Sequence, residues 1–136
     1  MASDDVETVY LTPQDALELY AAFAGGTAAD AANVLRSSPA LEGALDRPRT
    51  YAHYQNADLA AQAAVLAHGI AEDQPFLDGN KRLALVAMLT FLEVNGYRVE
   101  ATDPELADWI IALSDRLTPE ALAERLRRRL SLARPT

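Results

Sequence analysis

The sequence predicts an all-α protein, a compact bundle around a central buried helix at about residues 80–95. Three segments, "TPQD", "DPEL" and "TPEA", offer a capping side chain, then Pro and an acidic residue, which is the pattern of a helix start. The stretch "LALVAMLTFLEV" has no polar face, as expected for a helix inside a bundle. Strand signals are scant, so we expect at most a minor β ribbon.

The chain of 136 residues predicts a single domain, residues 1–136, with one core that needs no disulfide or metal. The absence of Cys excludes a thiolate metal site and fits a reducing compartment. No apolar run reaches the roughly 18 residues of a membrane span. The acidic start "MASDDVETVY" lacks the pattern of a secretory signal. We therefore expect no membrane partner and a cytoplasmic protein.

The net charge of −8 argues against a broad nucleic-acid surface. The C-terminal segment "LTPEALAERLRRRLSLARPT" is an exception, with five Arg against two Glu. We interpret it as the solvated end of a helix, where cations suit the helix dipole. A patch that binds RNA or a protein partner is the alternative.

The first predicted helix spans about residues 13–24 and ends at Gly25. The segment "SSPALEGALDRPRT" predicts a short helical piece closed by Pro48, because the residue before a proline avoids the helical region. An Ala-rich helix is expected at about 57–72, and the loop "EDQPFLDG" connects it to the central helix.

Two further helices are expected after the central one, at about 104–116 and 119–132. The first has apolar residues at helical spacing: Leu106, Trp109, Ile110 and Leu113. The second has Leu122, Leu126 and Leu130 on one face. The segments "ETVYL" and "YRVEA" (97–101) could pair as the small ribbon.

The stretch "EDQPFLDGNKR", Glu72 to Arg82, places cations at the start of the central helix. Each costs about 0.3–1 kcal/mol there, because the helix dipole is already positive at that end. Lys81 and Arg82 are explained if they face a bound anion together with the free N–H groups of the first turn. Gly79 would let that anion approach the backbone closely, and Asp78 could hold a Mg²⁺ that bridges phosphate oxygens. The pattern predicts a nucleotide-phosphate site.

Each of these residues also has a purely structural interpretation. Asp78 could be the N-cap of the helix, and Lys81 and Arg82 could reach solvent past its end. Phe76 and Pro75 are expected to be a core residue and a turn residue.

The stretch "QPFLDGNKR", followed by an apolar helix and "NGY", resembles the signature loop and helix of the Fic/Doc family. The similarity is to its short Doc (death-on-curing) branch. The segments "VYLTPQDALELY" and "LEGALDRPRTY" also resemble that branch, so the resemblance covers roughly residues 9–130.

The resemblance implies a role for each motif residue. Phe76 would anchor the loop in the core, Asp78 would hold Mg²⁺, and Arg82 would pair with a phosphate of ATP. The residues that would line the phosphate-binding nest are Gly79, Asn80 and Lys81. The catalytic set would be Gln74, which occupies the position of the motif His, with Lys81 and Arg82.

The second Arg of the AMP-transferring members would stand at Leu85, so it is missing, as in the Doc branch. The resemblance therefore implies a kinase that transfers the γ-phosphate of ATP to a hydroxyl of elongation factor Tu and blocks translation. It also implies a toxin–antitoxin pair whose antitoxin lays a C-terminal helical segment in a groove of the toxin.

Gln74 departs from the family pattern, because the motif His acts as general base and an amide has no pKa suited to that role. Gln could only orient the hydroxyl, and loss of a general base typically costs about 10²–10⁴ in rate. Natural degeneration, an engineered inactivating change and altered chemistry remain open as explanations. The protein with Gln74 is expected to have a reduced rate of phosphate transfer.

Three other features are not expected to take part in the chemistry. His68 is expected to be a partly buried helix residue, and His53 is expected in a loop that could overhang the groove. The segment "SPALEG", Ser38 to Gly43, matches a self-inhibitory element of some family members, but its Arg partner is absent here.

The leading hypothesis is therefore a Doc-type toxin that uses ATP and Mg²⁺. A non-catalytic module that holds a nucleotide or a partner is the alternative. AMP transfer is a weaker one, disfavoured by Leu85.

Overall fold

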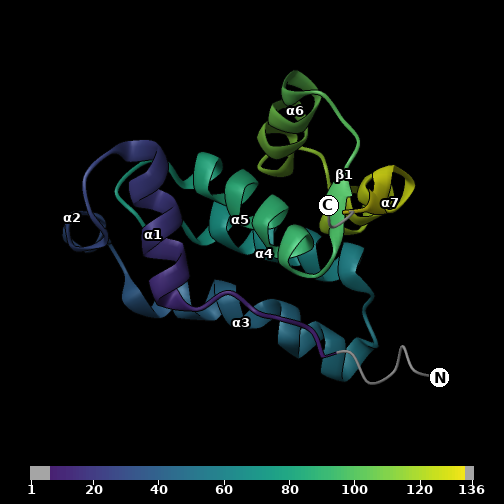
Figure 1. Ribbon diagram of the computed structural model, residues 1–136, viewed down its shortest axis with the longest axis horizontal. Helices are drawn as coiled ribbons and strands as arrows, with labels where there is room; N and C mark the ends of the chain where they lie inside the picture. The colour runs from purple at the N-terminus through teal and green to yellow at the C-terminus, as the bar shows by residue number, and fades with distance from the viewer. Residues whose placement is uncertain (1–6, 134–136) are drawn as a thin grey trace.

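The computed structural model describes residues 7–133, which form seven helices and two short strands (Figure 1). The helices are α1 (Pro13–Ala24), α2 (Ala28–Asn33), α3 (Ser38–Gln55), α4 (Leu59–Asp73), α5 (Asn80–Val94), α6 (Asp103–Leu113) and α7 (Pro119–Arg129). The strands are β1 (Tyr97–Val99) and β2 (Leu130–Leu132). The expected all-α bundle with a minor ribbon is confirmed.

The antiparallel pair α4 and α5 forms the centre of the bundle (Figure 1). α3 and α7 pack on α4, while α1 and α6 pack on α5. The buried surface of α4 includes many small residues, such as Ala63, Ala64 and Ala67, which let helices approach it closely on more than one side. α5 is central as expected, although Leu85, Val86 and Leu89 on its outer stripe are only half-buried.

The threonines before the prolines begin their helices as the sequence predicts. Thr12 and Thr118 accept hydrogen bonds from the backbone N–H groups of the first turns of α1 and α7. The prediction for "DPEL" was wrong by one residue, because Thr102 rather than Asp103 is the cap of α6. Thr102 forms a reciprocal capping box with Glu105, which satisfies two free N–H groups at once.

The prediction that Pro48 closes a short helix was wrong, since α3 continues through it to Gln55. Pro48 is buried in the long contact between α3 and α4, where packing outweighs the lost backbone hydrogen bond. On the same side, Arg47 reaches Asp73 of α4 at 2.9 Å.

The predicted ribbon has a different partner from the one expected. β1 pairs antiparallel with β2, with Tyr97 opposite Leu132, because the last helix ends at Arg129 and the chain continues as a strand. The segment at residues 7–11 is extended but is bound by a side chain. Asn95 accepts from the Val9 N–H at 2.8 Å and donates to the Val9 carbonyl at 2.9 Å.

The remaining differences are small. The helix expected to end at residue 116 ends at Leu113, and the short helix α2 was missed although Thr27 and Asp30 form a capping box there. None of the described helices is long and apolar enough to cross a membrane. Part of the acidic start, residues 1–6, lies outside the described residues.

Candidate functional site

The α4–α5 loop, residues 74–79, is held in place by the segment that connects α2 to α3. The Pro75 carbonyl accepts from the Arg36 N–H at 2.7 Å, and the Leu77 N–H donates to the Val34 carbonyl at 3.0 Å. Phe76 and Leu35 face each other between these bonds as an antiparallel bridge. The loop therefore has a fixed backbone at the end of the bundle beside α1 and α2 (Figure 1).

Phe76 and Asn80 fix the loop from the inside. Phe76 is 1% exposed and stacks on Tyr20 of α1, with ring centroids 4.2 Å apart. The buried side chain of Asn80 accepts from the Phe76 N–H and donates to the Phe76 carbonyl, both at 2.9 Å. Phe76 is a core residue, as expected. The side-chain amide of Asn80 is bonded to the loop, so only the backbone N–H of Asn80 is left for a ligand.

The first turn of α5 has no side-chain cap. Its N-cap is Gly79, whose φ of 77° lies in the left-handed region that favours glycine. Asp78 is thus not the N-cap, which excludes the structural interpretation offered for it. The N–H groups at this helix start remain available to an anion, and the helix dipole favours one there.

Asp78 is exposed beside this helix start, and Tyr20 is its hydrogen-bond partner. The Tyr20 hydroxyl donates to the Asp78 carbonyl at 3.2 Å and to Oδ1 at 3.1 Å. Burial raises the pKa of Tyr20, and the hydrogen bond to the Asp78 carboxylate and its charge raise it further. The hydroxyl therefore keeps its proton at neutral pH and acts as a donor.

Lys81 and Arg82 are exposed on the first turn of α5, and neither forms an ion pair within residues 7–133. The Arg82 guanidinium lies 5.1 Å from the centre of the Phe23 ring of α1. Both cations also border a groove of about 540 Å³ between α5 and α6. The other lining residues are mostly apolar: Leu85, Val86, Asp103, Ala107, Ile110 and Ile111. The two charges are free to meet an anion.

Gln74 ends α4 with a left-handed backbone, φ 49° and ψ 64°. Its side chain is exposed and makes no hydrogen bond to a described residue. Its carbonyl accepts from the guanidinium of Arg36, which also donates to the Asp73 carbonyl at 2.8 Å. The backbone at this position is therefore fixed while the side chain points freely into solvent.

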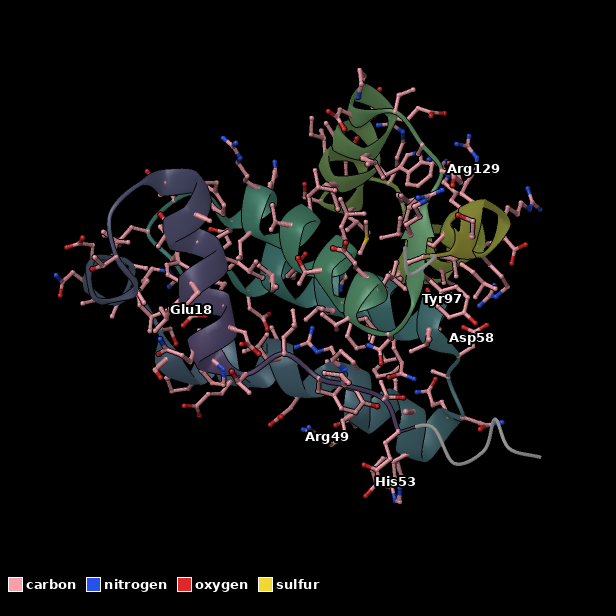
Figure 2. The ribbon with its side chains drawn as sticks, in the orientation of Figure 1. Glu18, Arg49, His53, Asp58, Tyr97 and Arg129 are labelled. Carbon is pink, nitrogen blue, oxygen red and sulfur yellow. The ribbon has the colours of Figure 1, made fainter. Side chains whose placement is uncertain are left out.

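The two histidines and Glu42 do not join this site. His53 lies inside α3, near its C-terminal end and against Tyr54, and not in the expected loop (Figure 2). His68 lies in α4 with its Nε2 3.9 Å from Glu72. Glu42 of the "SPALEG" segment borders a groove with Tyr10 and Arg49, while Arg82 lies over Phe23.

A comparison with known families identifies the family of the chain. The Fic/DOC family model matches residues 10–92, more than half of the chain, including the whole α4–α5 loop. The chain belongs to the Fic/DOC family. Members share a Fic-type fold, and many are toxins that transfer nucleotide or phosphate groups. No curated protein sequence matches the chain significantly.

The carboxylates beside the start of α5 are too few to hold a metal ion without other ligands. No cluster of three or more His, Cys, Asp or Glu side chains suited to a metal occurs between residues 7 and 133. Asp78 offers one carboxylate, of which Tyr20 engages one oxygen. Mg²⁺ often uses one or two carboxylates together with substrate phosphates and water, so the donor set fits an ion that arrives with a nucleotide.

Sequence reasoning missed three residues that build this Fic/DOC site. Tyr20 and Phe23 lie in α1 and Arg36 lies before α3, so their contacts with the loop span long separations along the chain. The aromatic residues of "LYAAF" stand three apart, which marks one face of a helix but not what that face meets.

Proposed function

We propose that this Fic/DOC protein is a Doc-type toxin that transfers the γ-phosphate of ATP to a hydroxyl of elongation factor Tu. The observation that carries the proposal is the uncapped start of α5, where Lys81 and Arg82 have no ion pair with any described residue and Asp78 precedes Gly79. Leu85 occupies the position of the second Arg of AMP-transferring members, which favours phosphate transfer over AMP transfer. The setting that fits this activity is the cytoplasm.

Different residues of the site would bind the phosphates, hold the metal ion and orient the hydroxyl. The N–H groups of the first turn of α5, with Lys81 and Arg82, hold the phosphates and stabilise their charge. Asp78 would hold Mg²⁺, which neutralises phosphate charge during such transfers. The hydroxyl oxygen bonds to the γ-phosphorus, the bond to the β-phosphate oxygen breaks, ADP leaves, and the hydroxyl proton needs an acceptor. Gln74 can orient the hydroxyl but cannot take this proton, so transfer is slow.

A non-catalytic binding module is the second candidate, and Gln74 is the observation that favours it. Its side chain is exposed and unsupported, and neither described histidine lies beside it. In this case the loop would hold a nucleotide or a partner without transfer.

The substitution Gln74→His tests the two candidates. The left-handed backbone at position 74 accepts His and Asn readily, so Gln74→Asn is a matched control that adds no base. We expect Gln74→His to raise labelling of elongation factor Tu from γ-labelled ATP by about 10²–10⁴ over both the unaltered protein and Gln74→Asn.

The other outcomes separate the alternatives. Labelling from α-labelled ATP would show AMP transfer. If Gln74→His neither labels the factor nor slows bacterial growth while calorimetry shows ATP binding, the binding module is the better description. If the unaltered protein labels as fast as Gln74→His, the account of the missing base is wrong.

We further propose that the antitoxin of this pair lays its helical segment in the groove between α5 and α6. The groove has an apolar wall that includes Ile110 and the exposed Ile111, and Lys81 and Arg82 stand at its end. These features suit an amphipathic helix with an acidic residue near the cations, which would also cover the phosphate site.

A further inference from the structure

Tyr20 contacts three successive parts of the α4–α5 loop. It is 5% exposed, and its ring is nearly parallel to that of Phe76, at an angle of 11°. A Cβ built on Gly79 would lie 3.2 Å from Cε2 of Tyr20 and 3.5 Å from Cε1 of Phe23. The loop therefore packs directly on α1, and these contacts fix the ring of Tyr20 against the loop.

The hydroxyl of Tyr20 binds two atoms of one residue. It lies 3.2 Å from the Asp78 carbonyl oxygen and 3.1 Å from Oδ1. An exposed aspartate ordinarily samples several side-chain rotamers. A donor that bridges the backbone and the carboxylate selects the rotamer in which Oδ1 faces Tyr20. The second carboxylate oxygen makes no hydrogen bond to a described residue and stays available.

We propose that Tyr20 is a positioning residue that holds the Asp78 carboxylate ready, with its second oxygen free, for the Mg²⁺ of a bound nucleoside triphosphate. The inference rests on the proposed function, because it requires that Asp78 meets this ion. Hydrogen-bond partners that orient a metal ligand typically contribute about 10- to 100-fold to metal affinity or activity. We expect the lower end, about 10-fold, because Asp78 is exposed and water can partly replace the hydrogen bond from Tyr20.

Binding of ATP with and without Mg²⁺ tests the proposal without any need for turnover. Lys81 is the one lysine of the sequence, so reductive methylation with ¹³C formaldehyde gives a single lysine signal beside the phosphate site. Titrations of ATP, followed by this signal and by calorimetry, are made in EDTA and at rising Mg²⁺. In the unaltered protein Mg²⁺ should tighten ATP binding, and Asp78→Asn should remove most of this gain.

The substitution Tyr20→Phe keeps the ring and removes the donor. It should raise the Mg²⁺ concentration needed for tight ATP binding by about 10-fold, while binding in EDTA stays close to that of the unaltered protein. In the Asp78→Asn background Tyr20→Phe should have no further effect on the Mg²⁺ dependence. Such a pattern distinguishes positioning from a general loss of loop stability.

The matched control is Tyr10→Phe. Tyr10 also donates one side-chain hydrogen bond, to Oε1 of Gln62 at 2.9 Å, but it does not contact the loop. Tyr10→Phe should lose comparable stability in urea and leave the Mg²⁺ dependence of ATP binding unchanged.

Three results would overturn the inference, and they differ in whether the proposed function also fails. If Mg²⁺ tightens ATP binding equally in Tyr20→Phe and in the unaltered protein, Tyr20 is structural and the proposed function stands. If ATP binds but Mg²⁺ has no effect, Asp78 does not meet the ion and the role of Tyr20 falls with it. If ATP does not bind the unaltered protein at all, the proposed phosphate site fails as well.

Discussion

The Asn80 side chain makes the two backbone hydrogen bonds to Phe76 that a neighbouring strand would otherwise make. On one side of the loop, residues 34–36 supply hydrogen bonds to Pro75 and Leu77. The N–H and carbonyl of Phe76 point the other way, and the Asn80 amide satisfies both. A buried donor or acceptor that lacks a partner costs about 1–3 kcal/mol, so this single side chain prevents two such penalties.

The substitution Asn80→Ala should therefore lower the free energy of unfolding by about 2–4 kcal/mol, because both backbone groups of Phe76 lose their partner. Urea denaturation at neutral pH measures this change. Asn95 is a comparison, since its amide makes the same pair of bonds to Val9 at an exposed position and one more, part-buried, to the Phe91 carbonyl. Asn95→Ala should cost less, about 1–2 kcal/mol, since water can replace its two exposed bonds to Val9 and only the bond to the Phe91 carbonyl is part-buried. Equal losses in the two variants would refute the argument from burial.

At the scale of elements, Glu105 connects the start of α6 to the end of α7. It completes the capping box with Thr102, and its Oε2 lies 3.0 Å from Nη2 of Arg129. Arg129 also donates to the Glu100 carbonyl at 2.9 Å and stands beside the β1–β2 ribbon (Figure 2). The hydrogen bond from Arg129, followed by that from the Thr102 N–H, lowers the pKa of Glu105 to about 2.

This pKa predicts an acid dependence of stability. The pKa of Glu105 is lower in the folded protein than its ordinary value of 4.5, so the unfolded chain binds more protons between these values. The contribution of Glu105 is complete above pH 4.5 and is lost as the pH falls toward about 2. Thermal melts from pH 7 to about pH 2 should show a shallower acid decline for Glu105→Gln and for Arg129→Gln than for the unaltered protein. Unchanged slopes in both variants would contradict the assignment.

At the scale of the whole molecule, the arginine run of α7 is largely neutralised by its neighbours. Arg127 pairs with Asp58 at 2.8 Å and with Glu124 at 2.7 Å, and Arg128 and Arg129 also have carboxylate partners. In this run only Arg125 lacks an ion pair among the described residues. The interpretation as a solvated helix end thus fits better than a free basic patch.

We therefore expect no measurable binding of single-stranded or duplex RNA at physiological salt. A protein of net charge −8 in which Arg127, Arg128 and Arg129 of α7 are paired with carboxylates has no broad surface that releases many counterions from phosphates. Fluorescence anisotropy of a labelled RNA of about 20 nucleotides tests this at two salt concentrations. Submicromolar binding that weakens steeply with salt would show that the arginine run forms a nucleic-acid surface.

Local signals in the sequence were sufficient for most helices. Thr12 and Thr118, each followed by Pro, fix helix starts through bonds within a few residues, and "LALVAMLTFLEV" was recognisable as a central helix. The motif residues 74–82 are contiguous, so the candidate site could also be located.

What the sequence could not supply depends on contacts between distant segments. Pro48 stays inside α3 because of packing on α4, and β1 pairs with β2 instead of the earlier segment. Tyr20 meets Asp78 from 58 positions away, and no local pattern encodes that distance. The roles assigned to Gln74, Asp78, Lys81 and Arg82 remain predictions for the experiments above.

The way Arg36 holds residue 74 has a genetic consequence. The Arg36 guanidinium donates only to the main-chain carbonyls of Asp73 and Gln74. The backbone of the turn therefore does not depend on which side chain stands at position 74. The codons for glutamine and histidine share their first two bases, so a single change at the third base exchanges one for the other. One point mutation can therefore place a histidine, the residue proposed as general base, at position 74, and one point mutation can remove it again. In both cases the backbone of the turn stays the same.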